Sequence, residues 1–222
     1  GTNNTAATGG VVHWFRGSAA GLVATTAGSA AVASIASVSS AGDMNGDGYA
    51  DVLVGNAFLR TARVAQVYRG GATGLVTTAS VPLSDTPPTS LGNTVVTDVG
   101  DINNDGFWDV SVSSAGSARV YYGNATLTSI GNNAVTGTTN FGEAVGMMGD
   151  ANRDGYWDLL VGSPDNADTV CRGDAWLYSG SATGVATTRF IRMTGTSTAC
   201  WTAFGISVAV RAPLRPSSMR RG

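Results

Sequence analysis

The chain has 222 residues, 43% of them hydrophobic, and a formal net charge of −2. It contains 31 glycines and no lysine, so a basic nucleic-acid-binding surface is not expected. No stretch reaches the about 18 apolar residues of a membrane span, so we predict no transmembrane segment. The composition favours an all-β fold of short strands joined by tight turns.

The first predicted element is an aromatic-ended strand that leads into a glycine-rich turn, over residues 11–17. The same pattern recurs at residues 64–70, 119–123 and 175–180, and each copy is followed by a further predicted strand. Residues 29–40 are rich in Ala, Ser and Val without a helical period, so we predict strand and loop there.

A second repeated segment alternates with the first along the chain. Residues 41–55, 99–113 and 148–162 each contain the pattern Asp-x-Asn-x-Asp-Gly-x-x-Asp, followed by a short apolar strand. Two markers that recur in the same order at intervals of about 50 residues indicate one repeating structural unit. Each unit is predicted to run strand, Asp-rich loop, strand, connection, strand, glycine turn, strand.

A four-stranded unit of about 40–50 residues is typical of a β-propeller blade. The chain starts with the second half of a repeat and ends with the first half of another, which gives about four blade equivalents. In a propeller, the two half-units can share one blade and close the ring. A homo-oligomer that completes a larger ring is the alternative.

The Asp-rich loops predict metal sites. Alternate oxygen-bearing side chains and a glycine at the sixth position suit a tightly curled loop that encloses a hard cation. We predict three Ca²⁺ sites, since no His or Cys lies in the loops to favour zinc or copper. The predicted ligands are the side chains of positions one, three, five and nine with the seventh carbonyl: Asp43, Asn45, Asp47, Tyr49, Asp51; Asp101, Asn103, Asp105, Phe107, Asp109; Asp150, Asn152, Asp154, Tyr156, Asp158.

Two competing interpretations of these loops are weaker. An EF-hand requires Glu at the twelfth position and flanking helices, whereas the twelfth residues here are Val54, Val112 and Val161 in strand patterns. Solvated turns would also contain Asp, Asn and Gly. However, nine of the chain's 15 acidic residues lie in the three loops, where they would repel one another without a cation.

The motifs resemble the FG-GAP repeat of integrin α-subunit propellers and related bacterial extracellular proteins. The resemblance rests on Phe141-Gly142, the three Asp loops, the Val161–Pro164 run and the strand ends at residues 15–17 and 178–180. It implies four-stranded propeller blades with calcium in the loop between the first two strands of a blade, at the residues given above. It also implies an extracellular, secreted protein that acts in adhesion or in sugar binding.

The end of the chain departs from the family pattern. Counted from Phe204-Gly205, the ligand positions of a fourth repeat are Pro213, Arg215, Ser217 and Arg221, and none is acidic. We therefore expect no calcium site there. The predicted boundaries are residues 1–210 for the blades, with a half-blade at each end, and residues 211–222 for an atypical basic tail.

The remaining chemistry-bearing residues point to structure rather than catalysis. Cys171 and Cys200 lie in connections expected on the same face of a propeller, so we predict a disulfide between them. His13, the single histidine, lies in an outer-strand pattern with no nucleophile elbow in the sequence. Asp174 completes an Arg-Gly-Asp tripeptide, which we interpret as the start of a strand. The recurrent tryptophans are assigned to packing between blades.

The sequence therefore predicts a non-enzymatic, extracellular, calcium-binding propeller that acts as an interaction or adhesion module for a protein or glycan ligand. A lectin-like propeller is the alternative, and a non-catalytic part of a secreted hydrolase is a weaker one. The residues do not choose between sugar and protein as the ligand.

Overall fold

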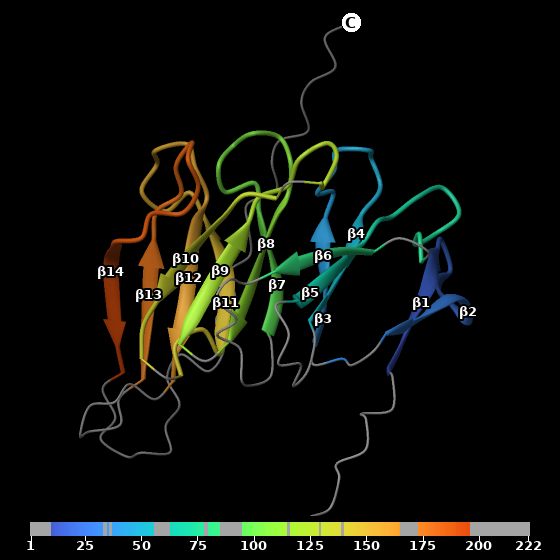
Figure 1. The fold of residues 1–222 in the computed structure, drawn as a ribbon, viewed down its shortest axis with the longest axis horizontal. Helices are drawn as coiled ribbons and strands as arrows, with labels where there is room; N and C mark the ends of the chain where they lie inside the picture. The colour runs from blue at the N-terminus through green and yellow to red at the C-terminus, as the bar shows by residue number, and fades with distance from the viewer. Residues whose placement is uncertain are drawn as a thin grey trace, which may run out of the picture.

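The computed structural model describes residues 10–32, 35, 37–55, 63–77, 80–84, 95–114, 116–128, 130–138, 140–164 and 173–195. These residues form strands and connecting loops, in agreement with the predicted all-β fold (Figure 1). No helix that could cross a bilayer occurs among them. Cys171, Cys200 and the predicted fourth repeat lie outside the described residues.

Three four-stranded antiparallel sheets follow one another along the chain. Blade 1 consists of β3 (Ser37–Gly42), β4 (Asp51–Gly55), β5 (Arg63–Tyr68) and β6 (Ser80–Ser84); blade 2 of β7 (Val95–Gly100), β8 (Asp109–Ser114), β9 (Ser117–Tyr121) and β10 (Asn132–Thr136); blade 3 of β11 (Ala144–Gly149), β12 (Asp158–Ser163), β13 (Asp174–Tyr178) and β14 (Arg189–Thr194). In each blade the strands lie in chain order, as the repeat pattern predicts.

A two-stranded sheet precedes the blades. β1 (Gly10–Ser18) pairs antiparallel with β2 (Gly21–Val32), and we call this pair the N-terminal hairpin. It lies where the sequence predicts a half-blade at the start of the chain, and its assignment as half of a blade stays a prediction. Closure of the sheets into a ring is not seen among the described residues.

The blades stack face to face because successive side chains of a strand point to opposite faces. In β4, Leu53 belongs to the apolar cluster between blades 1 and 2, whereas Val54 belongs to the cluster beneath the N-terminal hairpin. In β9, Tyr121 faces blade 1 and Val120 faces blade 3. Each blade is therefore apolar on both faces, as a propeller requires.

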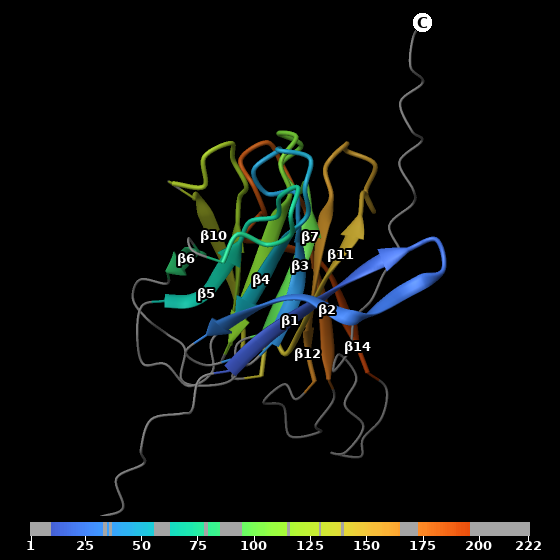
Figure 2. The same cartoon turned by 90° about the vertical axis from the view of Figure 1, so that its right-hand side faces the viewer.

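The first strand of each blade lies beside the first strands of its neighbours. β7 contacts both β3 and β11, and the three strands lie together at the centre of the view in Figure 2. This arrangement brings the loop that follows each first strand to the same edge of the stack. The order of strands within a blade thus determines where the Asp-rich loops meet.

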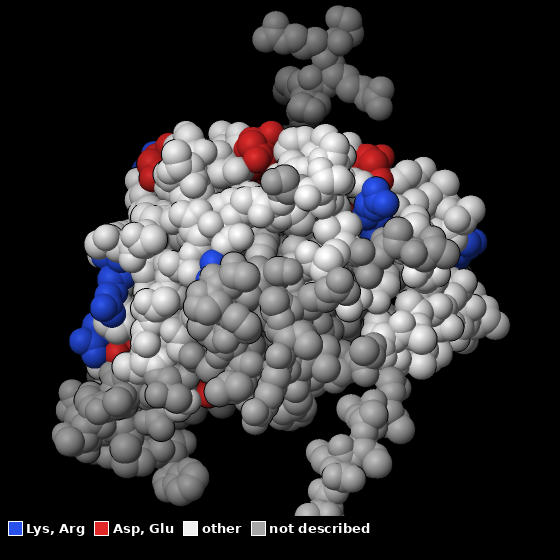
Figure 3. All heavy atoms as spheres, in the orientation of Figure 1, with Lys and Arg blue, Asp and Glu red and all other residues white. Residues whose placement is uncertain are grey.

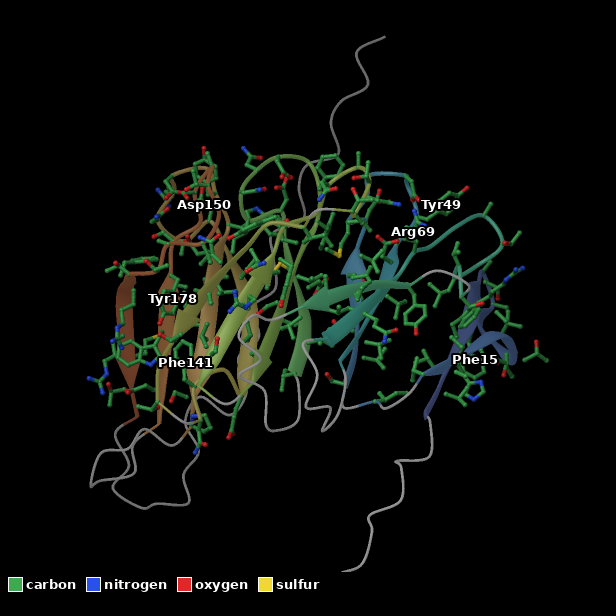
Figure 4. All side chains as sticks on the ribbon, viewed as in Figure 1. Phe15, Tyr49, Arg69, Phe141, Asp150 and Tyr178 are labelled. Carbon is green, nitrogen blue, oxygen red and sulfur yellow. The ribbon has the colours of Figure 1, made fainter. Side chains whose placement is uncertain are left out.

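The Phe141-Gly142 pair lies just before the first strand of blade 3, because β11 begins at Ala144. Gly142 has φ of +89°, which interrupts extended backbone, and the pair lies in a turn. Phe141 is buried and packs edge-on against Tyr178 of β13, with ring centroids 6.2 Å apart. The Phe-Gly pair therefore anchors the turn before the strand (Figure 4).

Candidate metal centre

The three Asp-rich loops connect the first and second strands of the three blades, as predicted. We call them Asp loop 1 (residues 43–51), Asp loop 2 (residues 101–109) and Asp loop 3 (residues 150–158). They lie along the upper edge of the molecule in Figure 1, and acidic side chains gather on the same edge in Figure 3. Asp150 and Tyr49, labelled in Figure 4, mark the two ends of this row.

Hydrogen bonds from the loop's own amides curl Asp loop 1. The carboxylate of Asp43 accepts the N–H of Asp47 at 3.0 Å and the N–H of Gly48 at 2.8 Å. Asn45 accepts the same Asp47 amide at 3.1 Å and donates its side-chain N–H to Asp47 Oδ2 at 2.8 Å. Asp47 Oδ1 in turn accepts the N–H of Tyr49 at 2.9 Å. Short polar side chains thus turn the backbone by bonding two to five residues ahead.

Asp loops 2 and 3 repeat this pattern. Asp101 and Asp150 each accept two amides, from the fifth and sixth residues of their loops, at 2.9–3.0 Å. The sixth-position glycines have φ between +88° and +95°, the left-handed region that glycine tolerates best. Sequence reasoning expected this glycine but missed the fourth position, which is also left-handed at Gly46, Asn104 and Arg153. Gly and Asn at two of these positions were the available signal.

The ninth aspartate of each loop has a different environment. Asp51, Asp109 and Asp158 are at most 1% exposed. One oxygen of each accepts the N–H of the loop's second residue, and the other accepts the N–H of the glycine after the blade's third strand. In blade 2 these distances are 2.8 Å from Ile102 and 2.9 Å from Gly123. The ninth aspartate therefore ties its loop to the third strand.

The glycines that donate to the ninth aspartates are required by close packing. A Cβ on Gly123 would collide with the carbonyl oxygen of Trp108 and lie 2.6 Å from that of Met44. A Cβ on Gly180 would meet the carbonyl oxygens of Trp157 and Ile102 in the same way. The glycine turns recognised in the sequence thus fit beneath the Asp loops.

Comparison with known families reaches the same repeats. The FG-GAP repeat matches residues 36–74, and the FG-GAP-like repeat matches residues 101–161. The chain is an FG-GAP repeat protein. The first match runs from the start of blade 1 to its glycine turn, and the second runs from Asp loop 2 to β12. Together with the four-stranded sheets, the FG-GAP repeats indicate a β-propeller interaction module. No curated protein matches the chain.

The electrostatics of the FG-GAP loops differ between the ninth position and the others. Burial raises the pKa of Asp51, Asp109 and Asp158, most for Asp109, whose pKa reaches about 7. The two backbone N–H bonds act in the opposite direction, and the first and fifth aspartates of each loop raise the pKa further by repulsion. Ionisation of the ninth carboxyl group is therefore unfavourable in its buried site, and a nearby cation would reduce this free-energy penalty.

The predicted ligand residues are brought together in three separate loops, one per FG-GAP repeat. Their carboxylates bond to loop amides, and among the described residues no three His, Cys, Asp or Glu side chains form a group placed to hold a metal ion. At the seventh position Tyr49 is 44% exposed, whereas Phe107 and Tyr156 are half-buried. The amide of each seventh residue donates to the fifth aspartate.

The last residue of the Arg-Gly-Asp tripeptide, Asp174, has a structural role in blade 3. Asp174 begins β13, is 1% exposed and accepts two hydrogen bonds from Arg192 of β14, at 3.1 and 2.8 Å. Its carboxylate is therefore held by the neighbouring strand of the same FG-GAP blade.

Proposed function

We propose that the protein is an extracellular, non-catalytic interaction module whose three Asp loops each bind one Ca²⁺ ion. The observation that carries the proposal is the threefold repetition of one arrangement. The three loops have the same oxygen-bearing side chains, the same internal hydrogen bonds and the same position between the first two strands of a blade.

The donor chemistry of the loops fits a hard cation. Each loop offers three carboxylates, one side-chain amide oxygen and backbone carbonyls, which are the ligands that Ca²⁺ prefers. A carboxylate has about four acceptor sites. The hydrogen bonds that Asp47, Asp105 and Asp154 accept from amide N–H groups use only some of them. The oxygens can therefore serve a cation while they keep the loop curled.

Calcium would supply the positive charge that three neighbouring carboxylates lack. The first and fifth aspartates would bind it, and the buried ninth aspartate would hold the loop against the third strand. Binding to the folded chain stabilises it by linkage. Calcium affinities of extracellular modules are typically weak, about 10⁻⁴–10⁻³ M, which suits loops that lie open at the surface.

For the partner, we propose a protein rather than a glycan. A groove of about 490 Å³ lies between blades 1 and 2. Six apolar residues line it, together with the polar Thr128 and Asn132: Val81, Pro82, Leu83, Tyr121, Leu127 and Ile130. Such a lining suits an apolar side chain of a partner better than a sugar hydroxyl. A surface-adhesion assay with Ca²⁺ or EDTA, with free sugars as competitors, distinguishes the two: competition by sugar would favour the lectin alternative.

Thermal unfolding with and without Ca²⁺ tests the calcium assignment. We expect the Tm of the wild type to rise with Ca²⁺, and the rise to shrink in each of Asp47→Ala, Asp105→Ala and Asp154→Ala. Glu143→Gln removes an exposed carboxylate outside the loops and is the matched control. Equal calcium responses in all variants would overturn the assignment.

A further inference from the structure

The eighth residue of Asp loops 2 and 3 is a tryptophan that packs on the loop of the preceding blade. The indole of Trp108 covers Gly42, the residue before Asp43, and the indole of Trp157 covers Gly100, the residue before Asp101. A Cβ on either glycine would collide with the indole ring, and both glycines have positive φ, +62° and +70°. Each tryptophan therefore fits the entry of a neighbouring loop.

Further contacts join Asp loops 1 and 2. The backbone N–H of Trp108 donates to the carbonyl of Asp43 at 3.2 Å, so Asp loop 2 bonds directly to the first ligand residue of Asp loop 1. The ring of Phe107 lies against Gly46, whose added Cβ would be 2.9 Å from it. The first half of Asp loop 1 is thus supported by residues of the next blade.

The two tryptophans also contact each other. Their ring centroids are 6.2 Å apart and their planes are inclined at 81°, an edge-to-face geometry that aromatic pairs favour. A continuous series of contacts therefore runs from Asp loop 3 through Trp157 and Trp108 to Asp loop 1. Asp loop 1 itself has Ala50 at the eighth position, so the series ends there.

We propose that Trp108 and Trp157 are positioning residues that couple adjacent Asp loops, so that cation binding by one loop strengthens binding by the loop before it. This inference rests on the proposed calcium binding. A loop that binds an ion loses conformational freedom, and its tryptophan then fixes Gly42 or Gly100 next to the first aspartate of the neighbouring loop. The neighbouring loop then loses less conformational entropy when it binds an ion, so its affinity for the cation rises. The coupling is reciprocal by thermodynamic necessity.

Hydrogen exchange in EDTA tests the contact without any cation. Trp108→Phe should raise the exchange rates of amides in residues 43–50 by about threefold or more and leave those in residues 150–157 unchanged. Trp176→Phe changes a half-buried tryptophan of β13 that stacks under Arg189, and is the matched control. Unchanged exchange in Asp loop 1 would overturn the proposal.

Calcium titration by calorimetry then tests the coupling itself. The wild type should bind with a Hill coefficient above 1, and Trp108→Phe and Trp157→Phe should bind the same number of ions with a coefficient near 1. Independent binding in the wild type, or an equal loss in Trp176→Phe, would contradict the coupling while leaving calcium binding intact. Absence of binding in the wild type would instead refute the proposed function, and with it the coupling.

Discussion

The fifth and ninth aspartates of each Asp loop lie four residues apart and have contrasting environments. The fifth aspartates, Asp47, Asp105 and Asp154, are exposed and bond only within their own loop. The ninth aspartates are buried and reach the glycine after the third strand. Each motif therefore contains a solvent-exposed carboxylate at the fifth position and a buried carboxylate at the ninth position that links the loop to the third strand. The two should fail in different ways when they are removed.

The largest effect is expected for Asp109→Ala. It leaves the buried amides of Ile102 and Gly123 without an acceptor, and each such loss costs about 1–3 kcal/mol. We expect the free energy of unfolding to fall by about 3 kcal/mol in urea titrations, in EDTA as well as in the presence of Ca²⁺. A loss that appears only when Ca²⁺ is present would show that the ninth aspartate acts purely as a ligand.

Gly123→Ala tests the contact between Asp109 and Gly123 from the side of the third strand. The new Cβ would press against the carbonyl oxygens of Trp108 and Met44, and overpacking of this kind costs about 1–3 kcal/mol. We expect a loss of about 2 kcal/mol in the same titration. Gly131→Ala, whose Cβ would have only an ordinary contact at 3.7 Å, is the matched control. Equal stability of the two variants would show that close packing of Gly123 beneath the Asp loop does not contribute to stability.

Asp109→Asn sharpens the comparison by keeping the shape of the side chain. The amide retains one acceptor oxygen and loses the other, so one of the two buried N–H groups stays unpaired. It also removes a charge that burial disfavours, since the pKa of Asp109 is raised to about 7. We expect a loss of about 1.5 kcal/mol, smaller than for alanine. A loss as large as that of Asp109→Ala would mean that the charge matters more than the hydrogen bonds.

Asp105→Ala should have the smallest effect on the calcium-free protein. The side chain is exposed and its bonds stay within the loop, so we expect a loss below about 1 kcal/mol in EDTA. In contrast with Asp109→Ala, the variant should lose stabilisation by Ca²⁺ at one loop. Thermal unfolding across a calcium titration measures both quantities. A large loss in EDTA would remove the distinction between the two positions.

The local parts of this arrangement were predictable from the sequence. The repeated strand–loop–strand pattern placed all three Asp loops between the first and second strands, and the need for left-handed backbone identified Gly48, Gly106 and Gly155. The recurrence of two sequence markers at intervals of about 50 residues predicted the blades, because each interval contains one four-stranded unit.

The parts that depend on distant residues were not predictable. Asp109 meets Gly123 only once three strands are paired, and Trp108 meets Gly42 only once two blades are stacked. The left-handed Arg153 carries no residue signal at all, since arginine is not a residue that favours this conformation. The disulfide predicted between Cys171 and Cys200 stays a prediction, because both residues lie outside the described part of the chain.

Native mass spectrometry of the intact chain, after dialysis against Ca²⁺ and again after EDTA, measures the ion count most directly. We predict three ions per chain with Ca²⁺, all removed by EDTA, and two ions in Asp105→Ala. A wild-type mass that shows no ion, or only one, would contradict the assignment of the three loops.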